Sequence, residues 1–182
     1  MVRVIDRYMI RIIRLGIGFN MAAGSVLWLL SPVYSLTNPE WRVLPLTLFT
    51  LAIAGILLIY WRPGNWWGRI GGILSVAGLL LILNYQLAPA QLTINASWAQ
   101  FILGFELLGG GLLLFGGNLV VTGSEKRGLP FVAVGIVALL LIYAISKSVS
   151  PFQGTLITTA NLLFGAGWIW LALSWARVSS DE

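Results

Sequence analysis

The sequence contains no histidine and no cysteine, and charged residues make up only 9% of its 182 positions. The chain therefore cannot form a Ser-His-Asp triad, a thiol nucleophile, a disulfide or one of the usual zinc sites. It also lacks the commonest axial ligand of haem. No two carboxylates share a helical face within an apolar segment, so a two-carboxylate or metal-assisted mechanism has no visible site. We expect a protein that is not an enzyme and that holds neither a cofactor nor a metal.

Long apolar segments are what the sequence has in excess. Hydrophobic residues make up 58% of the chain and the mean hydropathy is +0.90, whereas soluble domains carry about 25% charged residues. One bilayer crossing takes about 20 apolar residues, and the segments lack the apolar/polar alternation of barrel strands. We predict an all-α integral membrane protein, a single transmembrane domain with six transmembrane helices. The predicted spans are 10–31, 43–60, 69–88, 98–121, 129–147 and 154–176.

An internal repeat organises these spans. Gly55, Gly111 and Gly167 follow one another at intervals of 56 residues, each within an apolar run. Repeats of this kind usually mean stacked supersecondary units, so we predict that the six helices form three repeated helical hairpins. Because small residues let helices approach closely in lipid, we expect the three glycines to be helix-packing positions beside a neighbouring helix. The hairpin units cover approximately 10–60, 69–121 and 129–176.

A second glycine series lies in the first helix of each predicted hairpin. Its members are Gly24, Gly78 and Gly135, and they precede the marker glycines of their own units by 31, 33 and 32 residues. Successive units that each cross twice enter the membrane in the same sense. The three copies should therefore be related by an axis along the membrane normal.

The basic residues predict the orientation, because cytoplasmic loops accumulate Lys and Arg. Nine of the eleven would lie on one side and only Arg42 and Lys147 on the other. We expect a multi-pass protein of a bacterial-type inner (plasma) membrane with both termini cytoplasmic. The net charge of +5 indicates topology and anionic lipids on the cytoplasmic side as partners, and no nucleic acid. The first span continues beyond Ser25 to Leu30, so we expect an uncleaved helix in place of a signal peptide.

Glu106 is the one acidic residue within a predicted span. A charge near the centre of a bilayer costs about 2.5–3.5 kcal/mol on insertion scales. We therefore expect the carboxyl to be turned inward and either neutral or paired with Arg42 or Lys147. Two roles stay open: a structural carboxyl that links helices, or a site that senses protons or a ligand.

Other polar and aromatic side chains have simpler expected roles. The asparagines of four different spans should form interhelical hydrogen bonds; they are Asn20, Asn84, Asn118 and Asn161. A polar cavity lined by these amides is the alternative, which their different depths disfavour. Eight tryptophans lie near predicted span ends, as in an interfacial belt; they are Trp28, Trp41, Trp61, Trp66, Trp67, Trp98, Trp168 and Trp175.

Glycine- and leucine-rich stretches carry a family resemblance. In the segments 73–82 (ILSVAGLLLI) and 102–111 (ILGFELLGGG), and next in 131–175, the chain resembles the HdeD-like family of small bacterial membrane proteins. That family is named for an acid-resistance protein and consists of repeated two-helix units. The resemblance implies three hairpins and a role in stress response, and it brings no catalytic residues with it.

Two functions follow as hypotheses. The first is a non-enzymatic HdeD-like membrane protein that contributes to envelope or acid stress tolerance, or that serves as an accessory subunit. Its partners would be a second copy of the chain or a larger membrane complex. The alternative is a substrate-binding membrane component of a vitamin-type transporter, which shares the six-helix plan with both termini inside. A membrane enzyme is disfavoured by the missing histidine, cysteine and acidic motifs.

Overall fold

The computed structural model describes residues 2–34, 43–60, 65–87, 94–123, 125–146 and 153–178. These residues form six α-helices, and no strand occurs among them. Such a backbone satisfies its own hydrogen bonds, as a chain within lipid must. The helices are α1 (Val2–Tyr34), α2 (Val43–Ile59), α3 (Trp66–Leu87), α4 (Ile94–Val121), α5 (Glu125–Ser146) and α6 (Gln153–Val178).

Five helices contain a segment long and apolar enough to cross a membrane. The prediction of an α-helical membrane protein is therefore confirmed, and the five segments agree within three residues with five of the predicted spans. The remaining helix, α2, has 17 residues, which at ~1.5 Å each reach roughly 25 Å, slightly less than the ~30 Å hydrocarbon core. The five segments are Met9–Ser31, Trp66–Leu87, Trp98–Val121, Arg127–Ser146 and Thr155–Trp175.

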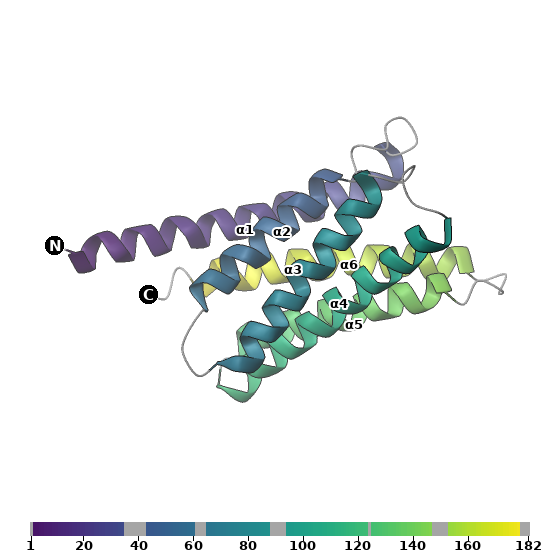
Figure 1. The fold of residues 1–182 in the computed structure, drawn as a ribbon. Coiled ribbons are helices and arrows are strands. Elements are labelled where there is room, and N and C mark those ends of the chain that lie inside the picture. Colours follow the sequence, from purple (N-terminus) through teal and green to yellow (C-terminus); the bar gives the residue numbers. More distant parts are fainter. Residues whose placement is uncertain are drawn as a thin grey trace.

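The helices form a closed ring (Figure 1). Each helix packs on the next one in the chain, and α6 packs on α1. Among the described residues, the backbones of no other two helices come close. One end of the ring, which we call the base end, holds the starts of α1, α3 and α5 and the ends of α2, α4 and α6 (Figure 1). The opposite end, which we call the tip end, holds the ends of α1, α3 and α5 and the starts of α2, α4 and α6.

Glycines bring α4 into direct backbone contact with both of its neighbours. A Cβ on Gly111 would lie 2.6 Å from the carbonyl oxygen of Gly71 in α3, and one on Gly109 would lie 2.9 Å from that of Gly135 in α5. On each face of α4 the two glycines are seven residues apart, which keeps them on one side of the helix. Close packing of this kind is a main source of helix association in lipid. The four antiparallel pairs are Gly71–Gly111, Gly78–Gly104, Gly109–Gly135 and Gly116–Gly128.

Aromatic side chains fill the centre of the ring. Phe49 of α2 stacks on Trp168 of α6 with ring centroids 4.2 Å apart and planes 12° apart, and both side chains are completely buried. Phe164 packs edge-on against both, at 6.2 and 6.0 Å. Offset stacks and edge-to-face pairs are the arrangements that ring quadrupoles favour. These rings therefore lie at the centre of a buried core that aliphatic side chains from all six helices complete.

The position of Trp168 corrects one sequence prediction. We expected Trp168 and Trp175 in the interfacial belt, but both are buried inside the ring. Distance from a span end, counted in residues, gives no information on which face of the helix a side chain occupies. Trp66 and Trp67 at the start of α3 and Trp98 in α4 are exposed, as belt residues would be. Trp41 and Trp61 lie outside the described residues.

Candidate functional site: a cavity at the tip end

A cavity of about 260 Å³ lies inside the ring near the tip end, and all six helices contribute to its wall. It lies between the last turns of α1, α3 and α5 and the first turns of α2, α4 and α6. Aliphatic side chains form much of the lining. We call it the tip cavity and define it by its polar and aromatic lining residues, Ser31, Gln86, Asn161, Trp28, Phe101 and Phe105.

The aromatic residues come from opposite sides of the ring. Trp28 belongs to α1, whereas Phe101 and Phe105 belong to α4, three places away in the ring. The buried ring of Phe164 joins the two sides, with its centroid 5.2 Å from that of Trp28 and 6.1 Å from that of Phe105. Phe101 packs on Phe105 at 5.0 Å. The tip cavity therefore has aromatic walls that the central core holds in place.

Three half-buried polar side chains from three helices line the same cavity. They are Ser31 of α1, Gln86 of α3 and Asn161 of α6. Within the described part of the chain, neither Gln86 nor Asn161 uses its side-chain amide in a hydrogen bond. By contrast, Gln100 donates from its Nε2 to the carbonyl oxygen of Leu81, at 3.3 Å, and so links α4 to α3. The amides of Gln86 and Asn161 are thus available to a molecule in the cavity.

Among the described residues, none that lines the tip cavity is ionisable. The polar groups of this lining are one hydroxyl, two carboxamides and the indole N–H of Trp28, which together offer both donors and acceptors. An apolar cleft with a few placed polar groups is the usual form of a small-molecule site. Over the described residues, no group of three His, Cys, Asp or Glu side chains is arranged to hold a metal ion.

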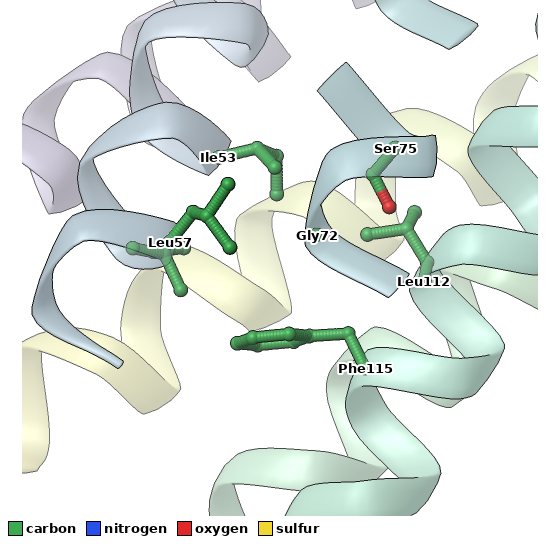
Figure 2. Close-up of a pocket in the computed structure, with 7 residues that line it drawn as sticks. Ile53, Leu57, Gly72, Ser75, Leu112 and Phe115 are labelled. Carbon is green, nitrogen blue, oxygen red and sulfur yellow. The ribbon is translucent and has the colours of Figure 1, made fainter. Parts of the chain in front are cut away.

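A second space, between α2, α3 and α4, is a packing gap and offers no room for a ligand. Figure 2 shows Ile53 and Leu57 of α2 facing Gly72 and Ser75 of α3, with Phe115 of α4 closing the gap. The gap is too narrow to hold a water molecule. The hydroxyl of Ser75 donates to the carbonyl oxygen of Gly71 at 2.8 Å, so the helix itself satisfies it.

Glu106 lies on the outer surface of the ring. It falls within the span Trp98–Val121 and its side chain is exposed, which is the reverse of the inward orientation that we expected. The reason is the crowding of α4: two of its faces carry the glycine contacts to α3 and α5, and a third carries Phe105 into the core. Glu106 occupies the face that remains. Its expected partners, Arg42 and Lys147, lie outside the described residues.

The three marker glycines each lie against the first helix of their own predicted hairpin. A Cβ on Gly55 would lie 2.9 Å from Cγ1 of Ile17, and one on Gly167 would lie 2.9 Å from Cγ2 of Val134. Gly111 is closer to its neighbour, since its Cβ would lie 2.6 Å from the backbone nitrogen of Ser75.

The second glycine series is less regular. Gly24 faces Phe49 of α2 and Gly78 faces Leu108 of α4, so each lies against the second helix of its own unit. Gly135 faces Gly109 of α4 and not α6. The first helix of the third unit is therefore packed differently from those of the first two units.

The four intramembrane asparagines do not converge. Only Asn161 lines the tip cavity, while Asn84 is exposed and Asn20 is half-buried. The Nδ2 of Asn118 is buried without a hydrogen-bond partner among the described residues. Sequence reasoning missed Gln86 and Ser31, because polar residues near span ends are common and carry no signal of a shared cavity.

At the base end a polar contact joins the start of α5 to the residue that follows α2. Arg127 at the start of α5 donates from Nη1 to the hydroxyl of Tyr60, just after α2, at 3.1 Å. The ring of Tyr60 packs on Phe115 and Trp175, each at 5.9 Å. This cluster closes the base end of the ring with aromatic side chains, so the tip and base ends differ in character.

Comparison of the chain with protein-family models, with curated proteins and with solved structures finds no match. The resemblance to the HdeD-like family therefore rests on the sequence stretches that carry it. A function for this chain is therefore inferred from the geometry of the ring and of the tip cavity.

Proposed function

We propose that this chain is a non-enzymatic, multi-pass membrane protein that binds a small molecule in the tip cavity. The observation that carries the proposal is a cavity of about 260 Å³ to which all six helices contribute. Ligand sites between the helices of a bundle, with an apolar lining and a few convergent polar groups, are common. The lack of histidine and cysteine supports binding as the function in preference to catalysis.

Six membrane crossings are part of the proposal. Although α2 is short, it packs between α1 and α3 in the ring, and its residues Leu46, Phe49 and Ile53 are buried. A helix in this position has the same surroundings as its membrane-length neighbours. Both termini would then lie on one side, and the basic residues favour the cytoplasmic side of a bacterial-type inner membrane.

Three repeated hairpins are also proposed, and the burial pattern supports them. In the second helix of each unit, several sets of positions 56 residues apart share the same degree of exposure. Three such sets are buried, namely Ala52, Leu108 and Phe164; Ile53, Gly109 and Gly165; and Ile56, Leu112 and Trp168. One set, Leu58, Leu114 and Trp170, is exposed. A common register of this kind is what repeated units stacked around a ring should give.

The two hypotheses from the sequence make different use of this architecture. An HdeD-like role in envelope or acid stress, or as an accessory subunit, is supported by the two-helix units alone and needs no cavity. A substrate-binding component of a transporter needs a site that opens toward one side of the membrane. The position of the tip cavity favours the second hypothesis, with the first kept as the alternative.

The test is to fill the cavity and to ask whether a bound small molecule is lost. Leu141 lines the tip cavity and is buried, whereas the adjacent Leu140 is exposed. Leu141→Trp should fill the space, and Leu140→Trp is the matched control on the outer surface. The wild-type chain, purified in mild detergent, is examined by native mass spectrometry for a co-purifying small molecule.

We expect the wild type and Leu140→Trp to carry the same small molecule and Leu141→Trp to carry none. Folding of each variant is checked by circular dichroism and by its elution in gel filtration. A wild-type chain that carries nothing, or a ligand that Leu141→Trp retains, would overturn the assignment of the tip cavity as a binding site.

A further inference from the structure

We infer that the ligand of the tip cavity is a neutral, planar molecule of about two fused rings with a lactam-type edge, which Gln86 and Asn161 recognise. This inference rests on the proposed function and adds the chemical class of the ligand. It follows from three properties of the wall as the described residues form it: none of them is ionisable, several are aromatic and two are carboxamides.

The ligand should be neutral because no described residue of the wall would compensate a charge. The described lining residues are apolar except for one hydroxyl, two carboxamides and the indole N–H of Trp28, and an unpaired charge within an apolar site is strongly disfavoured. Glu106 cannot compensate a charge on the ligand, since its side chain lies on the outer surface of the ring.

The ligand should be planar because aromatic side chains from opposite sides of the ring line the cavity. Trp28 on one side and Phe105 on the other both pack against Phe164, and such rings favour a flat aromatic ligand through stacking or edge contacts. The volume of the cavity limits the size of the ligand. An apolar cavity of about 150 Å³ holds benzene, so one of about 260 Å³ has room for a second fused ring.

The polar edge follows from the two carboxamides. Each offers an N–H donor next to a C=O acceptor, which is the complement of a lactam with its own adjacent C=O and N–H. Gln86 of α3 and Asn161 of α6 both line the cavity, so the C=O of the lactam can accept from one amide while its N–H donates to the other. Ser31 of α1 adds a hydroxyl to the same wall.

The experiment measures binding of four probes to the full chain by equilibrium dialysis against empty detergent micelles. The probe of the inferred class is 2-quinolinone. Naphthalene keeps the rings without the polar edge, 2-quinolinone-4-carboxylate adds a charge, and decahydroquinolin-2-one keeps the lactam without aromatic rings. We expect 2-quinolinone to bind at least tenfold more tightly than each of the other three.

Three variants test whether the carboxamides of the cavity wall bind 2-quinolinone. Asn161→Leu and Gln86→Leu should each weaken 2-quinolinone binding about tenfold or more. Asn84→Leu, the same kind of change at an exposed position of α3, should leave it unchanged. Because two independent variants probe the edge, failure of one to fold does not remove the test.

The outcomes separate this inference from the proposed function. If the charged or the saturated probe binds most tightly, and Leu141→Trp abolishes that binding, the tip cavity is a binding site and the inferred class is wrong. If 2-quinolinone binds but the Asn161 and Gln86 variants bind it equally well, the recognition by the amides is wrong. If no probe binds in a way that Leu141→Trp abolishes, the inferred class is wrong, and native mass spectrometry then decides the proposed function separately.

Discussion

Glu106 places a carboxyl on the outer surface of α4, within a membrane-length segment. The neighbouring Gly110, one turn further on, is also open, since nothing lies within 4 Å of where its Cβ would be. A carboxylate exposed to hydrocarbon costs about 2.5–3.5 kcal/mol near the bilayer centre. At the residue scale, substitution of this carboxyl distinguishes a surface that contacts lipid from one that contacts a second copy of the chain.

We expect Glu106→Leu to fold normally and to insert into the membrane more favourably, by up to about 3 kcal/mol. The reason is that the side chain is exposed and its replacement removes a polar group from lipid. Thermal unfolding in detergent and an insertion assay measure the two effects, with Glu106→Gln as the isosteric control. A Leu variant that unfolds at a lower temperature, or that dissociates an oligomer held together in the wild type and in the Gln variant, would show that the carboxyl makes a protein contact.

At the scale of the element, α4 is the helix with the strictest packing. Its glycines contact backbone on two sides, at Gly71 of α3 and Gly135 of α5. Gly55 and Gly167 differ, because their nearest contacts are side-chain atoms of Ile17 and Val134. A side chain can move where a helix backbone cannot, so equal substitutions should have unequal effects.

Gly111→Ala should lower the free energy of unfolding by roughly 1–3 kcal/mol, the usual cost of overpacking, because its Cβ would lie 2.6 Å from the backbone of α3. Gly167→Ala should cost less, since the Cγ2 of Val134 is its nearest contact. The matched control is Gly110→Ala, because a Cβ there would have no heavy atom within 4 Å. Its higher helix propensity should raise the free energy of unfolding by up to ~1 kcal/mol. Unfolding in a denaturing detergent ranks the three; an Ala at Gly111 that is as stable as one at Gly110 would contradict the close packing.

At the scale of the whole molecule, the contact between α1 and α6 closes the ring. Ile17, Met21 and Ser25 of α1 are buried, and a Cβ on Gly165 of α6 would lie 2.6 Å from the side chain of Leu29. Without α1, the column of rings in the core would be open on one side. The first helix is therefore packed as part of the same domain.

The topology can be tested with single cysteines, because the chain has none of its own. We expect an impermeant thiol reagent, added outside intact cells, to label cysteines placed at Asn38, Asn95 or Gln153 but not one at Gly64. The physical reason is the retention of nine of the eleven basic residues on the cytoplasmic side. A labelled Gly64 position with the other three unlabelled would mean that the orientation is inverted.

Composition and hydropathy alone were enough to predict the class of this protein and the five membrane-length helices of its described part. The length and apolarity of a span are local properties of the sequence, and they decide whether a helix can cross a bilayer. The marker glycines could also be recognised, since each lies in an apolar run. The residues that these glycines contact could not be predicted from the sequence, and neither could the outward position of Glu106. The neighbours of a residue depend on how each helix is rotated within the ring.

The existence of the tip cavity follows from the tertiary structure alone. Its polar residues Ser31, Gln86 and Asn161 come from three helices and share no spacing in the sequence. Trp168 likewise lies near the end of the chain, yet the ring places it at the centre of the core on Phe49. Closure of the ring brings these side chains together, and that closure depends on the packing of all six helices at once.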